Sequence, residues 1–367
     1  MVVSNVIPHN CPSILPEDTM AVSEAISTKW LTQGPLVSKF EDALCQYLSN
    51  NNRKNPLRGA AVSSGSAALF LALKALEIGN GDEVLVPTYA CSSLLNAVYL
   101  VGATPIILDI SDIDFNPTVD MVSNKITDNT RAVVLTHTFG VPTDTMAFKE
   151  LGIRVIEDCA QSIGAKYRGE NVGRLGDIAT FSFFATKMIT TGHGGMVVSD
   201  DHTLVERVRD YCNYDGRKEY YPRFNFQMTD FQAALGLSQL DRLSDFIAKR
   251  LSCSGRYESA LGEKHSFVRQ TPVGPGLPNG YRFALKLGSN LANAEKLMLD
   301  RGITCIRPII PEELLHRYLD LSPSDFPCAE LVAANTLSVP IFPSLSEDQI
   351  IRIVDGLTAL KDTIDSK

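Results

Sequence analysis

The feature that most constrains the fold of this chain is a regular alternation of short apolar runs and helical stretches between residues 60 and 198. Helical stretches such as Leu69–Leu76 and Leu94–Val101 separate the runs, and the alternation is typical of βαβ units with right-handed crossovers. We therefore predict an α/β fold with a mostly parallel sheet. The runs expected to form buried strands are residues 60–63, 83–87, 105–108, 131–136, 153–156 and 178–184.

Polar side chains gather at the ends of the last two predicted strands. Asp158 and Gln161 follow the first, and Ser182 and Lys187 close the second. Because ligands of parallel sheets bind at the carboxyl ends of the strands, we expect these four residues to meet at one molecule. Pyridoxal phosphate (PLP) needs a lysine amine for its aldehyde and a carboxylate that keeps its pyridine nitrogen protonated. Lys187 and Asp158 suit these roles together, although each alone is more often a surface lysine or a turn cap.

A segment of small residues, Ser64-Gly65-Ser66-Ala67-Ala68, joins the first predicted strand to a helix. Small residues leave backbone N–H groups accessible at the positive end of a helix, where phosphate binds well. Taken alone, the segment would equally be a serine N-cap followed by a glycine for close packing. Upstream of Asp158 and Lys187, it predicts the seat of the cofactor phosphate, with Gly65 and Ser66 as donors and Ser182 as a third.

Several longer segments carry a resemblance to a known family. The most specific are IEDCAQSIGA (156–165), VGRLGDIATFSFFATKMITTGHGG (172–195) and RFNFQMTDFQAALGLSQL (223–240). Further similarity lies in GDEVLVPTYACSS (81–93) and LSVPIFPSLS (337–346). In these segments the chain resembles the DegT/DnrJ/EryC1/StrS aminotransferases, which are PLP enzymes acting mostly on nucleotide-linked keto-sugars. The similarity runs in order along nearly the whole chain.

The resemblance implies a fold-type-I PLP transferase with two domains. The large PLP-binding domain, with an N-terminal arm and a seven-stranded type of sheet, would span residues 1–245. A smaller C-terminal α+β domain would span residues 246–367. The implied reaction is a ping-pong transamination through a Schiff base on Lys187. It would move an amino group from an amino acid, glutamate or glutamine, to a keto group of a nucleotide-linked sugar, as in amino-sugar or polysaccharide biosynthesis.

The resemblance also assigns roles to residues outside the first four. Cys91 would lie beside the pyridine ring, where family members often have an aromatic side chain, with Tyr89 as the alternative neighbour of the ring. Gln161 would border the ring. Asn225 would reach the cofactor phosphate of a neighbouring subunit, which implies a homodimer with shared active sites.

Five residues are expected near the sugar substrate. Thr32 lies in the loop WLTQGP, Tyr89 follows the strand 83–87, and His193 stands where most family members have Glu. Tyr220 and Arg223 belong to an aromatic, charged loop that could equally pack at a dimer contact. For Thr32, a purely structural turn is the alternative.

Two other functions remain possible from the sequence. The first is a PLP-dependent sugar dehydratase of the same family, a branch in which histidine replaces the Schiff-base lysine. The second is a cofactor-binding regulatory homologue without turnover. The presence of Lys187 argues against the dehydratase. Lys187, Asp158 and Ser182 together argue against the regulatory homologue, but the departures from the family pattern at Cys91 and His193 leave it open.

Composition excludes several other classes. The net charge of −8 and the pI near 5.3 provide no basic footprint for nucleic acid or an anionic membrane. The eight cysteines lie apart without a CxxC pair, which argues against a zinc site or a disulfide framework. We see neither a signal peptide nor an apolar stretch long enough to span a bilayer, so a cytoplasmic protein without a metal is expected.

The remaining predictions concern structure. His137, at the end of the strand 131–136, is interpreted as a structural histidine, and Asp144 as a helix cap. A single helix is expected over Thr229–Arg250, and a strand over Ile303–Ile306.

Overall fold

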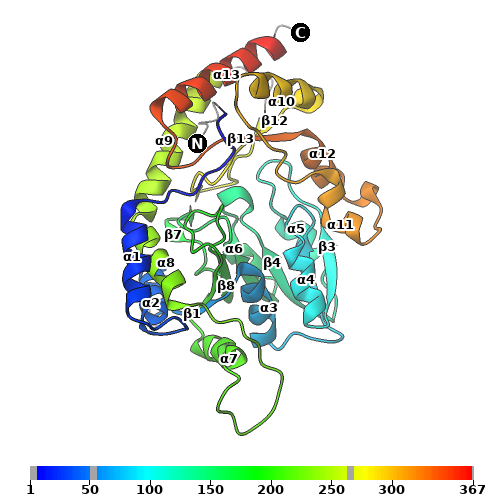
Figure 1. The fold of residues 1–367 in the computed structure, drawn as a ribbon. Coiled ribbons are helices and arrows are strands. Elements are labelled where there is room, and N and C mark those ends of the chain that lie inside the picture. Colours follow the sequence, from blue (N-terminus) through cyan, green and yellow to red (C-terminus); the bar gives the residue numbers. More distant parts are fainter. Residues whose placement is uncertain (1–5, 50–55, 263–267, 366–367) are drawn as a thin grey trace.

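The computed structural model describes residues 6–49, 56–262 and 268–365. Its central feature is a seven-stranded sheet with the order β1-β9-β8-β5-β4-β2-β3 (Figure 1). Strand β9 runs antiparallel to both neighbours, and the other strands are parallel to one another. The predicted α/β fold with a mostly parallel sheet is confirmed. The strands are β1 (Arg58–Val62), β2 (Glu83–Pro87), β3 (Thr104–Leu108), β4 (Thr130–Leu135), β5 (Arg154–Asp158), β8 (Ile178–Ser182) and β9 (Gly195–Ser199).

Helices cover both faces of this sheet. Those of the N-terminal two thirds are α1 (Pro16–Ser27), α2 (Pro35–Leu48), α3 (Gly65–Ala75), α4 (Ser93–Leu100), α5 (Val119–Ser123), α6 (Thr145–Lys149), α7 (His202–Cys212), α8 (Asp230–Asp241) and α9 (Leu243–Leu261). Three short strands form a separate sheet in the order β11-β6-β7. They are β6 (Lys166–Tyr167), β7 (Glu170–Asn171) and β11 (Gly276–Leu277).

The central strands are apolar on both sides, as expected for a covered parallel sheet. In β4, Val134 packs into the large core that includes α3 and α4, whereas Val133 faces a smaller core with Val122 of α5 and Phe148 of α6. This alternation follows from the two-residue period of a strand. It explains why the runs are continuous in branched aliphatic residues and why they could be recognised as strands.

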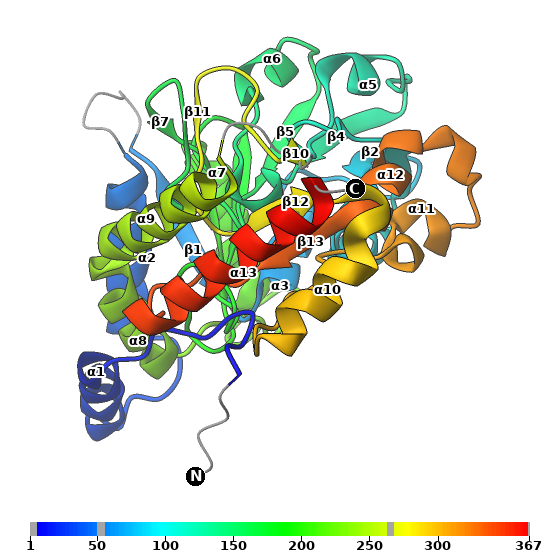
Figure 2. The ribbon, with the colours of Figure 1, turned by 90° about the horizontal axis from the view of Figure 1, so that it is seen from above.

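The C-terminal part forms a second layer above the large sheet (Figures 1 and 2). An antiparallel sheet in the order β10-β12-β13 packs with α10 and α13 around a core of its own. Its elements are β10 (Val268–Arg269), β12 (Phe283–Lys286), β13 (Thr336–Val339), α10 (Leu291–Asp300), α11 (Leu315–Tyr318), α12 (Pro327–Asn335) and α13 (Glu347–Asp365). Short 3₁₀ turns lie at Thr138–Gly140, Gly288–Asn290, Pro311–Glu313 and Pro323–Asp325.

Helix α9 connects the two cores. Its Phe246 packs into the core of the large sheet, and its Tyr257 and Leu261 pack into the C-terminal core. Ile7 of the N-terminal arm also belongs to the C-terminal core. The boundary between residues 245 and 246 stays a prediction, and it falls near the start of this connecting helix.

Two local predictions were wrong. The helix expected over Thr229–Arg250 is divided, because Arg242 leaves the helical conformation (φ −104°, ψ 4°) where its guanidinium pairs with buried Asp18 of α1. The strand expected over Ile303–Ile306 is absent from the described structure. Ile303 pairs with Ile7 and Ile306 with Ser338, so two different partners prevent a continuous ladder.

No helix within the three described ranges combines the length and the apolar character needed to cross a bilayer.

Candidate active site

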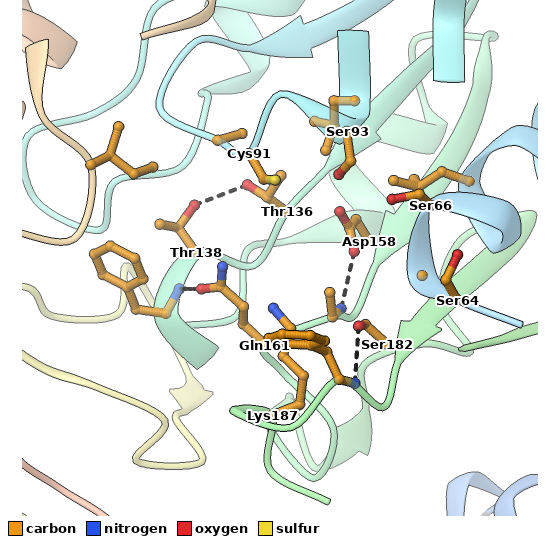
Figure 3. Close-up of a pocket in the computed structure, with 18 of the residues that line it drawn as sticks. Ser64, Ser66, Cys91, Ser93, Thr136, Thr138, Asp158, Gln161, Ser182 and Lys187 are labelled. Atoms are coloured by element: carbon orange, nitrogen blue, oxygen red, sulfur yellow. Dashed lines mark hydrogen bonds between the residues drawn. The ribbon is translucent and has the colours of Figure 1, made fainter. Parts of the chain in front are cut away.

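A cavity of about 450 Å³ opens at the carboxyl ends of the central strands (Figure 3). Its walls come from the ends of β2, β4, β5 and β8, from the start of α3 and from the loop before β9. The structure therefore brings together residues that are far apart in the sequence. Nine of the predicted site residues line it: Gly65, Ser66, Tyr89, Cys91, Asp158, Gln161, Ser182, Lys187 and His193.

Asp158, the last residue of β5, presents a buried carboxylate to this cavity. Only 8% of the residue is exposed, and its Oδ1 accepts a hydrogen bond of 3.0 Å from the Ala160 N–H. Among the described residues, no hydrogen-bond donor engages Oδ2. Burial raises the pKa of Asp158, although the Ala160 N–H and the charge of Lys187 act in the opposite direction. A positively charged N–H donor bound in the cavity would therefore stabilise the ionised form of this carboxylate.

The amide of Gln161 has a fixed orientation. Its Oε1 accepts a hydrogen bond of 3.0 Å from the backbone N–H of Phe139. The Gln161 amide nitrogen is therefore the group directed into the cavity, as Figure 3 shows. A bound molecule would meet a hydrogen-bond donor at this position.

The start of α3 forms a close-packed cradle with the end of β8. Ser64 caps the helix, since its Oγ accepts from the Ala67 N–H at 3.1 Å. A Cβ at Gly65 would lie 2.7 Å from the Ser182 Cβ and 3.0 Å from its Oγ, so only glycine fits. The capping and the phosphate-seat interpretations are therefore compatible: the Ser64 hydroxyl caps the helix, and Ser66 and Ser182 line the cavity.

Lys187 lies on the loop between β8 and β9, and hydrogen bonds join the two ends of this loop. The Phe183 N–H donates to the Gly194 carbonyl at 2.9 Å, and the Lys187 N–H donates to the Phe184 carbonyl at 2.9 Å. The Lys187 Nζ lies 5.8 Å from the centroid of the Tyr281 ring. These contacts fix the backbone of the loop, and the Lys187 side chain lines the cavity (Figure 3).

The two positions that depart from the family pattern both line the cavity. Cys91 is an exposed, free thiol just before α4. His193 is exposed, and its ring meets the Phe184 ring edge-on at 5.2 Å between centroids. The His193 carbonyl accepts hydrogen bonds from Thr191 and Gln232, so the backbone at this position is fixed while the ring is accessible.

Four predicted residues do not line the cavity of this chain. Thr32 is exposed, and its carbonyl accepts from the Asp230 N–H at 3.0 Å. Asn225 and Tyr220 are exposed, Tyr220 to 94%. The Arg223 guanidinium stacks on Tyr221 at 3.6 Å and pairs with Asp210. Their predicted roles at a shared site stay predictions.

The structure adds residues that the sequence analysis missed. Thr136 and Thr138 follow β4 and are hydrogen-bonded to each other at 2.9 Å. The rule that identified Asp158, polar residues at the end of a buried strand, would also have identified Thr136. Other additions contribute apolar walls or a small hydroxyl, for which the sequence offers no signal, among them Ser93, Leu69, Leu94, Phe139, Phe184 and Ile309.

His137 and Asp144 have structural partners. The fully buried His137 Nε2 lies 3.0 Å from Glu157 Oε1, and its Nδ1 accepts from the Thr143 N–H at 3.2 Å. Because Nδ1 is an acceptor, the ring proton lies on Nε2 and is donated to Glu157. Asp144 is the N-cap of α6, as predicted.

Comparison with known proteins identifies the family. The sequence model of the DegT/DnrJ/EryC1/StrS aminotransferase family matches residues 12–358. The chain belongs to this family. It is 33% identical over 367 residues to the GDP-perosamine synthase of Escherichia coli O157:H7, with 96% of this chain and 97% of that protein covered.

A second relative is named for a sugar linked to UDP, where the first is named for a sugar linked to GDP. The UDP-N-acetyl-3-dehydro-alpha-D-glucosamine 3-aminotransferase of Acidithiobacillus ferrooxidans is 35% identical over 308 residues, covering 80% of this chain and 82% of that protein. The crystal structure of the aminotransferase TlmJ from Streptoalloteichus hindustanus has a TM-score of 0.89 at 27% identity, covering 98% and 100% of the two chains. The chain is therefore an aminotransferase with the predicted fold-type-I architecture.

Proposed function

We propose that this DegT/DnrJ/EryC1/StrS aminotransferase uses PLP to move an amino group from glutamate or glutamine to a keto group of a nucleotide-linked sugar. The observation that supports this most is the placement of Lys187, Asp158 and the start of α3 on one cavity. Relatives named for GDP-linked and UDP-linked sugars support the substrate class.

The residues present fit PLP. Gly65 lacks a side chain where a Cβ would displace Ser182, and this leaves the helix N-terminus open for a phosphate. The buried Asp158 carboxylate has one oxygen without a donor, which suits a protonated ring nitrogen. The amide nitrogen of Gln161 would bind the ring oxygen. Ser66 and Ser182 would bind the phosphate, and Cys91 would lie beside the ring.

Asp158 and Lys187 have different roles in the proposed reaction. Bound PLP would supply an aldehyde for amino groups and a ring that withdraws electrons from the reacting carbon. Asp158 would hold the proton on the ring nitrogen. The Lys187 amine, once displaced by the donor's amino group, would move a proton from the donor's α-carbon to the cofactor. The same amine would return a proton to the sugar carbon in the second half-reaction, which gives ping-pong kinetics.

A homodimer is part of this proposal. Asn225 is exposed and lies outside the cavity of its own chain, which suits a role at the cofactor phosphate of a second subunit. A dehydratase is disfavoured because a lysine, and not a histidine, occupies position 187 and faces the cavity.

The test uses the purified protein loaded with PLP. We expect a visible absorption band that disappears on addition of L-glutamate or L-glutamine and returns with a GDP-linked or UDP-linked keto-sugar. Asp158→Asn should keep the fold but slow the first step at least about 100-fold, since general acid–base and charge effects of this kind contribute 10²–10⁴-fold. Asp201→Asn, at the surface cap of α7, is the matched control. A wild-type protein whose band responds to no amino donor would refute the proposal.

A further inference from the structure

Arg282 lies next to the proposed active site and has no acidic partner among the described residues. It immediately precedes β12, and its guanidinium carbon lies 5.2 Å from the ring centroid of Phe139, a residue of the cavity wall. Its Nε is buried without a hydrogen-bond partner, and its Nη1 lies 3.5 Å from the His9 Nε2. Across the described ranges, no carboxylate comes within ion-pair distance of this guanidinium.

Two partly exposed arginines elsewhere in the described chain have acidic partners. Arg242 pairs with Asp18, and Arg209 pairs with Glu41. Arg250, which lies close to Arg282, donates to the carbonyls of Tyr281 and Ile341 at 3.2 and 2.6 Å. Those carbonyls engage only one nitrogen of the Arg250 guanidinium, whose Nε has no hydrogen-bond partner, and they do not cancel its charge.

The neighbourhood of Arg282 therefore has an excess of positive charge. Burial, together with the charges of Arg282 and Arg250, lowers the pKa of His9 to about 3, so His9 is neutral at physiological pH. Burial alone would raise the pKa of Tyr281. The charges of Lys187, Arg282 and Arg250 outweigh that effect and hold the pKa of the phenol below its usual value.

The Tyr281 ring connects this positive region to the reacting amine. The Lys187 Nζ lies 5.8 Å from the ring centroid, and the Arg282 guanidinium carbon lies 5.4 Å from the same point. The Lys187 amine and the Arg282 guanidinium thus have one aromatic ring as a common neighbour, and a carboxylate bound by Arg282 would lie beside that ring, next to the cavity that Lys187 lines. The diphosphate of a sugar nucleotide is a weaker candidate, because the sugar ring separates it from the reacting carbon.

We propose that Arg282 binds a carboxylate of the amino-acid donor. This inference rests on the proposed aminotransferase function. A guanidinium forms paired, charge-assisted hydrogen bonds with a carboxylate, and an unpaired Nε leaves one side of the fork available. Arg282 is then a donor-binding residue contributed by the C-terminal layer to a cavity built mainly on the large sheet.

The test separates the two half-reactions. With Arg282→Gln, the apparent Kd for L-glutamate, measured from the loss of the absorption band, should rise at least about tenfold. The Kd for an amino-sugar nucleotide that the wild type accepts, measured in the reverse of the second half-reaction, should change less than about twofold. Arg282→Lys, which keeps the charge, should show a smaller loss than Arg282→Gln. Arg256→Gln, at an exposed ion pair with Glu347, is the matched control.

An unchanged Kd for glutamate, or an equal loss in both half-reactions, would overturn the role of Arg282. Calorimetric titration of glutarate, a dicarboxylate without an amino group, gives a readout that does not depend on turnover. The wild type should bind glutarate at least about tenfold more tightly than Arg282→Gln, and equal binding would refute the inference. If the wild type reacts with no amino donor, the proposed function fails, and the glutarate comparison still decides whether Arg282 binds carboxylates.

Discussion

Gly65 is the residue at which local packing and cofactor binding impose the same requirement. A side chain there would push against Ser182, and Ser182 is one of the predicted phosphate ligands. Gly65→Ala should therefore move the Ser182 hydroxyl and weaken PLP binding at least about tenfold, since hydrogen bonds to charged groups contribute about 1.5–3 kcal/mol. The Kd for PLP can be measured by absorbance titration of the cofactor-free protein.

The control for this substitution is Gly79→Ala, where the nearest atom to a new Cβ is the Val101 carbonyl oxygen at 3.6 Å. That variant should bind PLP like the wild type. An unchanged Kd for Gly65→Ala would show that the start of α3 is not the phosphate seat.

Glu157 gives a residue-scale prediction about pH. The carboxylate is fully buried and accepts hydrogen bonds from His137 and from the N–H groups of Gly173, Leu175 and Gly176. Burial acts to raise the pKa of Glu157, but these donors outweigh it and hold the pKa below its ordinary value. Its contribution to stability is therefore complete above the unfolded pKa of about 4.3 and is lost as the pH falls toward the folded value.

Glu157→Gln should lower the free energy of unfolding by about 3 kcal/mol at neutral pH, because an amide replaces a buried carboxylate and leaves some of its hydrogen-bond donors without an acceptor. The loss should shrink as the pH falls below about 4.3, because Glu157 of the unfolded wild type then takes up a proton before Glu157 of the folded protein does. Denaturant unfolding at a series of pH values measures both effects. A difference between the two proteins that stays constant down to the acid limit would contradict this account.

At the scale of elements, the attachment of α1 to α8 depends on one buried acid. Asp18 accepts hydrogen bonds from Ser238 at 2.7 Å and Gln239 at 3.0 Å, pairs with Arg242, and accepts from the Leu15 N–H at its own helix start. Asp18→Ala leaves a half-buried arginine unpaired and should destabilise the protein by about 3 kcal/mol.

The neighbouring variant Glu17→Ala removes an exposed acid from the same helical turn and should change stability by less than about 0.5 kcal/mol. Thermal or denaturant unfolding compares the two variants. Equal effects would mean that charge in the first turn, and not the contact with α8, accounts for the role of Asp18.

The elements also show which structural features were predictable. Strands such as β2 and β4 lie between two helical layers, so their continuous apolar runs identify them locally. The break at Arg242 depends on Asp18, which is 224 residues away in the chain, and no local pattern reveals such a pair.

The same distinction applies to the site. Asp158, Gln161, Ser182 and Lys187 are at strand ends or in adjacent turns, where motif and topology agree, and all four line the cavity. Arg282 lies beside Phe139 of the cavity wall through packing of the C-terminal layer on the large sheet, which the sequence does not display. Asn225 is predicted to act in a second subunit, and Tyr220 near the sugar or at a dimer contact, so the geometry of one chain tests neither prediction.

At the scale of the whole molecule, the proposed shared site predicts complementation between two inactive variants. If Asn225 acts across subunits, each active site combines Lys187 of one subunit with Asn225 of the other. In a dimer of one Lys187→Ala chain and one Asn225→Ala chain, one site then carries both substitutions and the other carries neither. Coexpression should then produce mixed dimers with one intact site, and activity should exceed that of either variant alone. The activity of isolated mixed dimers, purified with two affinity tags, measures this. Mixed dimers that are no more active than the parents would place Asn225 in its own subunit's site or outside any site.

The central claim is that Lys187 is the residue to which PLP is attached and at which transamination takes place. Borohydride reduction of the PLP-loaded protein, followed by peptide mass mapping, tests it directly. The account predicts a pyridoxyl-phosphate adduct on the peptide containing Lys187, and loss of that adduct when L-glutamate or L-glutamine is added before reduction. An adduct on another lysine, or one that no amino donor removes, would contradict it.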